Sequence, residues 1–158
     1  MQPPKKIPIG NGKFAIVDKK HFNRLSRYKW HTSADGYAVR HAYVDGKRTS
    51  TSMHRDLLSV GGKLEVDHRN GDKLDNRVSN LRRATRSQNE ANKPKSIANT
   101  CGYKGVCLHR GKWRAYIMKS KKQRHLGYYG SVVDAAKAYN RAAISLFGSF
   151  ANVNKLEV

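Results

Sequence analysis

Residues 64–72 constrain the fold of this chain more than any other stretch. Leu64-Glu65-Val66 is a short half-apolar run that predicts a strand, and Asp67 and His68 stand at its end. Arg69-Asn70-Gly71-Asp72 has the composition of a turn, because Asn and Gly adopt positive φ at low cost. The run therefore predicts a strand that delivers a carboxylate and an imidazole to the start of a tight loop.

The residues that follow predict a second strand and a helix. Leu81 to Thr85 is expected to return as a strand. Ser87 precedes Glu90 by three residues, which is the spacing of a capping box, so a helix is expected to begin at Ser87 with Asn89 in its first turn. Pro94 limits that helix to one or two turns. The whole pattern is a compact strand–turn–strand–helix unit.

Asp67, His68 and two asparagines form a chemically coherent set. Asn80 and Asn89 lie 12 and 21 residues beyond His68. Carboxylate and amide oxygens are hard ligands that suit Mg²⁺ or Mn²⁺ better than zinc. An imidazole with an unperturbed pKa of about 6.5 can take a proton from water near neutral pH. This set is what a small metal-dependent phosphodiesterase site requires.

The same residues resemble the HNH homing endonucleases, in the variant whose third histidine is an asparagine. The resemblance is carried by Asp67-His68, by the runs Ser79–Arg82 and Ser87–Asn89, and by the region before them that ends in Met53–Leu58. It covers residues 7–93 and points to phage and intron-encoded members of the family. It implies a ββα-metal (His-Me finger) fold in which Asp67 and Asn89 hold one Mg²⁺ or Mn²⁺ ion. It further implies that His68 is the general base and that Asn80 orients the active-site loop.

The charge of the chain favours a polyanionic partner. The 158 residues include 32 Lys and Arg against 11 Asp and Glu, a formal net charge of +21. Residues 1–93 hold 20 basic against 9 acidic residues, and residues 94–158 hold 12 against 2, so both halves are strongly basic. Nucleic acid is the ordinary partner for such a charge, although a ribosomal-type or merely cationic protein has the same composition.

Few other compositional signals bear on function. Cys101 and Cys107 are too few for the paired-cysteine zinc sites of some HNH proteins, and free thiols fit a reducing cytosol. Residues 1–6 lack an apolar core, so they do not form a signal peptide, and they are expected to be disordered. No apolar run is long enough to span a membrane. A cytoplasmic protein of a bacterial or phage-infected cell is expected.

Elements upstream of residue 64 can also be predicted. Residues 14–17 read as a strand, residues 19–28 as a helix, and residues 37–44 and 48–53 as strands joined at Asp45-Gly46. Residues 54–60 are expected to be helical. His21, His31 and His41 are expected to be ordinary partly buried residues. His54 stands near the motif, so the sequence leaves open whether it lines the site or is another ordinary buried residue.

The second half has a different pattern. Residues 94–101 are polar and contain Pro94, so they predict a linker between domains at 1–93 and 102–158. Strands are expected at 103–108, 113–118 and 124–129, and a helix at 131–147 with small residues at spacings of three and four. The fold class is therefore α+β, with a three-stranded antiparallel sheet and one packed helix after the nuclease part.

This second half resembles the plant Apetala/ethylene-response-factor DNA-binding domain. The matching residues include Tyr103–Val106, Gly111–Trp113, Leu126-Gly127 and Arg141–Ala143. The resemblance implies that the sheet docks in a DNA major groove. The residues expected at DNA are Lys104, Arg110, Trp113, Arg114 and Lys119. The plant pattern is broken at Cys107, His109 and Tyr116, so the plant target sequence does not transfer; simple packing is the alternative for Trp113 and Tyr116.

Together these patterns predict a site-specific, metal-dependent DNA endonuclease of the homing type that acts on duplex DNA as a monomer. Arg82, Arg83 and Arg86 are candidates for phosphate contacts, with a solvated basic face as the alternative. One rival is a DNA-binding transcriptional regulator that keeps an inactive nuclease scaffold. The other is a structural or RNA-binding basic protein.

Overall fold

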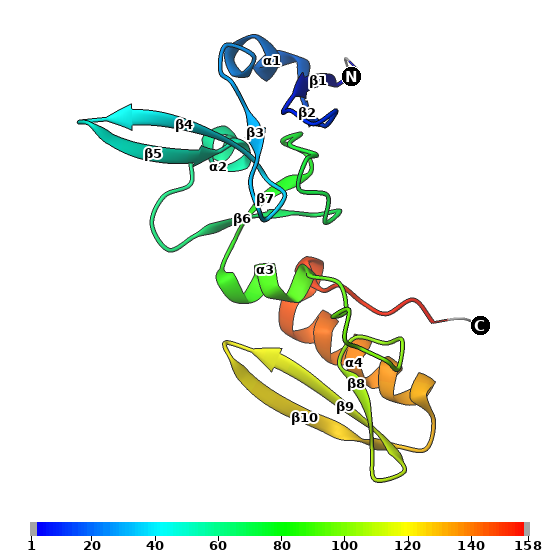
Figure 1. The fold of residues 1–158 in the computed structure, drawn as a ribbon. Helices are drawn as coiled ribbons and strands as arrows, with labels where there is room; N and C mark the ends of the chain where they lie inside the picture. Colours follow the sequence, from blue (N-terminus) through cyan, green and yellow to red (C-terminus); the bar gives the residue numbers. More distant parts are fainter. Residues whose placement is uncertain (1–2, 157–158) are drawn as a thin grey trace. The chain divides into compact units, whose positions relative to one another are not determined.

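The computed structural model describes residues 3–156, and the chain divides after Ala84 into two compact units. Each unit combines helices with small antiparallel sheets, so the fold is a mixture of α and β structure (Figure 1). The specific ββα-metal arrangement implied by the family resemblance stays a prediction.

Within residues 3–84, the first unit contains three small sheets and two short helices. Strand β1 pairs with β2, strand β4 lies between β3 and β5, and β6 pairs with β7, all antiparallel. The elements are β1 (Lys5–Pro8), β2 (Phe14–Val17), α1 (Lys19–Leu25), β3 (His31–Thr32), β4 (Ala38–Val44), β5 (Lys47–Ser52), α2 (Met53–Leu58), β6 (Glu65–His68) and β7 (Leu81–Ala84). The predicted strands and helices of this half are confirmed, with ends shifted by a few residues.

One prediction for the first unit is wrong. Residues 1–6 were expected to be disordered, but Lys5 and Lys6 belong to β1 and pair with Val17 and Ile16 of β2. The physical reason is the apolar residue that follows them, because Ile7 is almost fully buried in the core of the unit. Residues 1 and 2 lie outside the described residues.

The core of the first unit joins the N-terminal hairpin to both helices. Its buried side chains come from β1, β2, α1 and α2 and from the segments between them: Ile7, Ile9, Ala15, Val17, Leu25, Trp30, Ala38 and Met53. The indole nitrogen of Trp30 donates to the carbonyl of Leu25 at 2.8 Å, so its only polar atom is satisfied inside the core.

The loop between β6 and β7 is attached to this core through β2. The backbone N–H of Ile16 donates to the carbonyl of Leu74 at 2.8 Å, and the N–H of Asn76 donates to the carbonyl of Ile16 at 2.7 Å. Asp18 adds a contact, since its carboxylate accepts from the N–H of Val78 at 2.8 Å. A segment near the N-terminus therefore fixes the backbone of a loop about 60 residues later in the chain.

The second unit is a three-stranded antiparallel sheet with one long helix across it. The sheet order is β10-β9-β8, and α4 covers one face (Figure 1). Buried alanines of α4, among them Ala135, Ala136 and Ala143, allow this close approach. The elements are α3 (Arg86–Asn92), β8 (Val106–His109), β9 (Lys112–Lys119), β10 (Lys122–Tyr129), α4 (Val132–Phe147) and the 3₁₀ turn η1 (Gly148–Phe150). The predicted sheet and helix are confirmed.

The start of α3 corrects one sequence interpretation. The N-cap is Thr85, whose hydroxyl accepts from the N–H of Gln88 while the Gln88 side chain accepts from the N–H of Thr85. The capping box therefore lies two residues before the predicted Ser87–Glu90 pair. At α4 the N-cap is Ser131, whose hydroxyl accepts from the N–H of Val133 at 3.1 Å.

The segment predicted as a linker, residues 94–101, lacks helix and strand but lies within the second unit. The Asn99 amide donates to the carbonyls of Tyr103 and Val106, and the Cys101 thiol donates to the carbonyl of Val106. The boundary between a nuclease part and a DNA-binding part stays a prediction. Across residues 3–156, no helix combines the length and the apolar character that a membrane crossing requires.

Candidate functional site

The β6–β7 hairpin carries the acidic and imidazole groups that the sequence singled out. In its register Asp67 lies opposite Arg82, and His68 lies opposite Leu81. Asp67, His68 and Arg82 are all buried. A short strand pair thus holds a carboxylate and an imidazole on successive residues in a largely dry environment.

Asp67 forms a buried ion pair with Arg82. The guanidinium Nε donates to Oδ2 of Asp67 at 2.6 Å, and both side chains are less than a tenth exposed. This position does not support the predicted phosphate contact of Arg82, because its guanidinium is already bound to a carboxylate inside the unit. Arg83 is exposed and donates to the carbonyl of Leu58 at 3.0 Å. Arg86 lies exposed at the start of α3.

His68 is enclosed by two rings and one amide. Its ring lies 5.1 Å from the ring of His54 and 5.9 Å from that of Tyr37, and its Nε2 is 3.4 Å from Oδ1 of Asn76. Burial lowers the pKa of His68 below its ordinary 6.5, while the Asn76 hydrogen bond and the nearby carboxylates act in the opposite direction. A lowered pKa keeps the imidazole neutral at pH 7, the state in which it can accept a proton.

His54 is a site residue that the sequence left open. It is buried at the start of α2, and its ring lies edge-on to His68 and 4.9 Å from Tyr37. Burial lowers its pKa to about 3, with the neighbouring His68 contributing. Its Nδ1 is buried and has no hydrogen-bond partner among residues 3–156. Tyr37, which the sequence gave no reason to select, completes this cluster.

Asn80 holds the loop that begins after His68. Its Oδ1 accepts from the N–H of Asn70 at 3.1 Å, and its Nδ2 donates to Oδ1 of Asn70 and to the carbonyl of Asp75. Its own carbonyl accepts from the N–H of Arg69 at 2.9 Å. One buried side chain therefore joins both ends of the loop.

Asp75 supports the same loop through charged contacts. Its carboxylate accepts from Arg77 Nη2 at 2.6 Å and from the Asn70 amide at 3.0 Å. The hydrogen bonds from Arg77 hold the pKa of Asp75 below its ordinary 3.8. Asp75 thus remains ionised near neutral pH and keeps this part of the loop anchored.

Asn89, the second predicted metal ligand, lies in α3 and therefore in the second unit. The positions of the two units relative to each other are not determined (Figure 1). The pairing of Asp67 with Asn89 stays a prediction.

The residues present suit a weakly coordinated, hard divalent cation. Within residues 3–156, no three His, Cys, Asp or Glu side chains cluster so as to hold a metal ion. Mg²⁺ commonly uses only one or two protein oxygens and completes its shell with water and phosphate. The carboxylate of Asp67, whose Oδ2 accepts from Arg82, is an oxygen donor of the kind that Mg²⁺ prefers.

In the second unit, the open face of the sheet carries cationic and aromatic side chains. Arg114 lies opposite Cys107 and Tyr128 in the register, and its guanidinium is 5.4 Å from the ring of Tyr116. Tyr128 in turn contacts the rings of His109 and His125. This face is opposite the one that α4 covers.

The other predicted DNA contacts lie in three different surroundings. Arg110 and Lys119 are exposed, Arg110 in the β8–β9 turn and Lys119 at the end of β9. Trp113 alternates with Ala115 and Ile117 and packs against the buried cluster beneath α4. Its position favours the packing alternative over contact with DNA.

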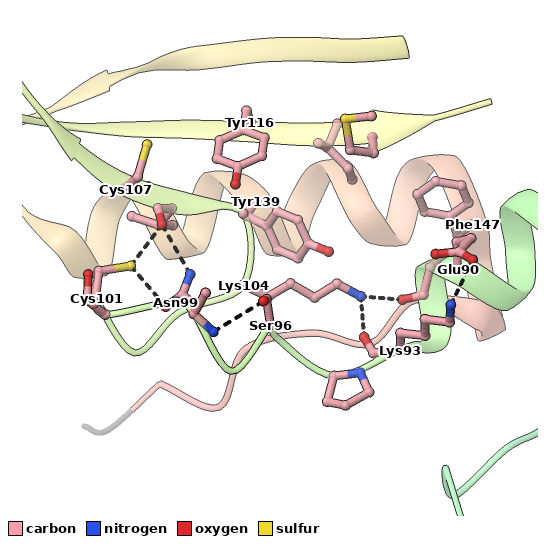
Figure 2. Close-up of a pocket in the computed structure, with 18 residues that line it drawn as sticks. Glu90, Lys93, Ser96, Asn99, Cys101, Lys104, Cys107, Tyr116, Tyr139 and Phe147 are labelled. Carbon is pink, nitrogen blue, oxygen red and sulfur yellow. Dashed lines mark hydrogen bonds and ion pairs between the residues drawn. The ribbon is translucent and has the colours of Figure 1, made fainter. Parts of the chain in front are cut away.

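Lys104 is directed into the second unit instead of toward the open face. It lines a cavity of about 600 Å³, together with Glu90, Tyr116 and Tyr139 (Figure 2). Its ammonium donates to the carbonyl of Ala91 at 2.6 Å and to that of Lys93, which lie at the end of α3. Burial lowers its pKa to about 8. These contacts do not support the predicted role of Lys104 at DNA.

A family model described as HNH endonuclease matches residues 59–91, which include β6, β7 and nearly all of α3. Over 154 residues the chain is 34% identical to an uncharacterized HNH endonuclease of Acanthamoeba polyphaga mimivirus, covering 94% of this chain and 78% of that protein.

Shorter matches link part of the chain to plant proteins. It is 41% identical over 54 residues to APETALA2-like protein 2 of Oryza sativa, in subspecies indica and japonica, and 39% identical over 54 residues to an AP2-like ethylene-responsive transcription factor of Arabidopsis thaliana. Each match covers 33% of this chain, but only 12% of the rice proteins and 11% of the Arabidopsis protein.

The hairpin site and the match over 94% of this chain place the protein in the class of nucleases. Within that class, the chain belongs to the HNH endonuclease family.

Proposed function

We propose that this protein is a site-specific DNA endonuclease of the homing type, which hydrolyses phosphodiester bonds with one divalent cation. The observation that carries the proposal is the state of His68. It is buried, its pKa is lowered, and it directly follows Asp67 on a strand within a chain of the HNH family. The homing type is supported by the spacing of Asp67, His68, Asn80 and Asn89 that the sequence shares with that group.

His68 acts as the general base in this proposal. A neutral imidazole removes a proton from the attacking water, and the hydroxide then attacks the phosphorus atom of the scissile bond. Asn80 acts indirectly, since its hydrogen bonds to Arg69, Asn70 and Asp75 hold the loop that follows His68. Mg²⁺ or Mn²⁺ held by Asp67 and Asn89 would stabilise charge on the phosphate and on the leaving oxygen.

The second unit binds duplex DNA next to the cut in this proposal. The support is the open sheet face around Arg114, the exposed Arg110 and Lys119, and the short matches to plant transcription factors. Two linked DNA-binding modules raise each other's local concentration, so a monomer with moderate affinity in each module is sufficient. Affinity should fall steeply with salt, because phosphate contacts release counterions.

Cleavage of a supercoiled plasmid that carries candidate target DNA tests the catalytic part. With Mg²⁺ or Mn²⁺, the wild-type protein should relax or linearise the plasmid at one mapped position, and His68→Ala should not. His21→Ala is the matched control, because His21 lies on α1 and outside the site. Equal cleavage by wild type and His68→Ala would reject His68 as the base.

The same protein distinguishes the rival functions. Tight binding of a confirmed duplex target without cleavage in either metal would favour a DNA-binding regulator with an inactive nuclease scaffold. Stronger binding to RNA than to duplex DNA would favour the structural or RNA-binding class.

Binding assays test the sheet face. The double variant Arg114→Ala/Lys119→Ala should weaken duplex binding and reduce the slope of log affinity against log salt. Lys137→Ala is the control, because Lys137 is an exposed cation on α4, the helix that covers the opposite face of the sheet. If the control weakens binding as much per charge removed, contact through the open face is rejected.

A further inference from the structure

Asn76 is a buried amide in contact with the proposed base. It is 1% exposed, and its Oδ1 lies 3.4 Å from Nε2 of His68. None of the spacing arguments from sequence selects Asn76, and the roles proposed above do not include it. Its position beside the His68 ring is therefore unexplained by those roles.

The structure fixes which atom of the Asn76 amide faces His68. Its Nδ2 donates to the carbonyl of Leu74 at 3.1 Å, and its backbone N–H donates to the carbonyl of Ile16 at 2.7 Å. Rotating the amide by half a turn would place Oδ1 against the Leu74 carbonyl, so that two acceptors would face each other in a buried place. The orientation with Oδ1 toward His68 is the one that satisfies both groups.

This orientation determines the tautomer of His68. An amide oxygen only accepts hydrogen bonds, so a hydrogen bond to it requires that Nε2 of His68 carry a proton. A neutral imidazole carries one ring proton, and its lone pair is then on Nδ1. The Tyr37 and His54 rings pack against the same imidazole and restrict its rotation.

We propose that Asn76 is a positioning residue that holds His68 in the Nε2–H tautomer, so that Nδ1 is the nitrogen that takes the proton from water. The catalytic part of this inference rests on the proposed nuclease function. The chain of support runs from β2 through the backbone of Ile16 to Asn76 and then to His68.

The tautomer can be measured on the wild-type protein without any cleavage assay. Two-bond ¹H–¹⁵N correlation spectra of protein with ¹⁵N-labelled histidine, recorded near pH 7.5, distinguish protonated from unprotonated ring nitrogens. His68→Ala assigns the resonances. A protonated Nε2 and an unprotonated Nδ1 in His68 are expected, and the reverse pattern would overturn the proposal.

Two variants test whether Asn76 has this effect. Asn76→Leu has a similar size but no acceptor, whereas Asn76→Asp keeps an oxygen that can accept from Nε2. Loss of a supporting partner commonly lowers activity by about 10- to 100-fold. For Asn76→Leu we expect a loss of that size in the rate of single-turnover cleavage, with unchanged DNA affinity. The His68 ring of this variant should be a mixture of both tautomers, whereas in Asn76→Asp it should retain the Nε2–H tautomer. The control is Asn23→Leu, because Asn23 is exposed on α1.

The outcomes separate the inference from the function on which it rests. If wild type cleaves DNA and a folded Asn76→Leu variant cleaves at the wild-type rate with an unchanged tautomer, the role of Asn76 is overturned. If wild type fails to cleave any confirmed target in either metal, the nuclease proposal fails and the catalytic role of Asn76 fails with it. The wild-type spectrum still shows whether His68 has the Nε2–H tautomer that the Asn76 contact requires. This measurement does not depend on whether Asn76→Leu folds.

Discussion

Removing Arg82 should destabilise the first unit strongly, because it leaves the carboxylate of Asp67 buried without its cation. The two side chains are 8% and 4% exposed and their atoms are 2.6 Å apart. Breaking a buried ion pair on one side commonly costs about 3–5 kcal/mol, whereas an exposed pair contributes about 0–1 kcal/mol. Typical domains have about 5–15 kcal/mol of stability in total, so Arg82→Met should remove a large part of it.

Urea unfolding followed by tryptophan fluorescence measures this effect. Trp30 is buried in the first unit and Trp113 lies in the second, so a Trp113→Phe background makes the signal specific to the first unit. With a urea dependence of about 1–2 kcal/mol per molar, a loss of about 3–5 kcal/mol in Arg82→Met should lower the unfolding midpoint by about 1.5–5 M. Arg83→Met is the control. It removes an exposed neighbour with one bond to a carbonyl and should cost about 1 kcal/mol or less.

The double variant completes the argument. Asp67→Leu/Arg82→Met removes both charges, and a buried pair replaced by apolar residues is often as stable as the original. Its stability should therefore lie well above that of Arg82→Met alone. The buried-pair reasoning is refuted if the free energy of unfolding of Arg82→Met lies within about 1 kcal/mol of the wild-type value. It is also refuted if the double variant loses more stability than the sum of the losses in the two single variants.

Three further perturbations test other parts of the structure. Burial lowers the pKa of His54 from 6.5 to about 3, so between these pH values the unfolded chain binds a proton that the folded chain does not. The free energy of unfolding should therefore fall as the pH drops from 6.5, by at most about 1.4 kcal/mol per pH unit. In His54→Phe, the urea midpoint should depend less on pH between pH 7 and pH 5. Gly105→Ala should lower the free energy of unfolding of the second unit by several kcal/mol, because φ is +72° and an added Cβ would lie 2.1 Å from the Tyr139 ring. An unfolding midpoint equal to that of the wild type, measured by Trp113 fluorescence in urea, would contradict this. Lys104→Met should lower the melting temperature of the second unit, because it loses two hydrogen bonds to carbonyls that contribute about 1–3 kcal/mol together. Its affinity for duplex DNA should be nearly unchanged in a filter-binding assay. A lower affinity with unchanged stability would instead support the predicted contact of Lys104 with DNA.

Local sequence patterns predicted most of the secondary structure, because each of those elements depends on nearby residues. The apolar alternation of β6 and the turn residues after it placed Asp67 and His68 correctly at a strand end. The spacing of small residues along α4 was equally readable. The N-cap of α3 could not be predicted from local sequence. Ser87 and Thr85 each precede a Glu or Gln by three residues, and only the position at which β7 ends decides between them.

The contacts that define the candidate site depend on residues distant in sequence, and those were not predictable from spacing. The pairing of Asp67 with Arg82 follows only from the register of β6 and β7, so Arg82 read as one more surface cation in a basic run. The carbonyl contacts of Lys104 could not be predicted either, since they depend on how α3 packs beside the sheet. The role inferred for Asn76 requires β2, about 60 residues away.

The family match spans residues 59–91, yet parts of the first unit outside that range position His68. His54 and Tyr37 contact His68 from outside that range, and β2 holds the Asn76 backbone. A peptide of residues 59–91 would retain Asp67 and His68 but lose the core around Trp30 and Met53. Chains below about 40 residues rarely fold without disulfides or metals. Circular dichroism should therefore show this peptide unfolded, whereas residues 3–93 should give a cooperative melt; a folded short peptide would show that the hairpin and α3 position the site by themselves.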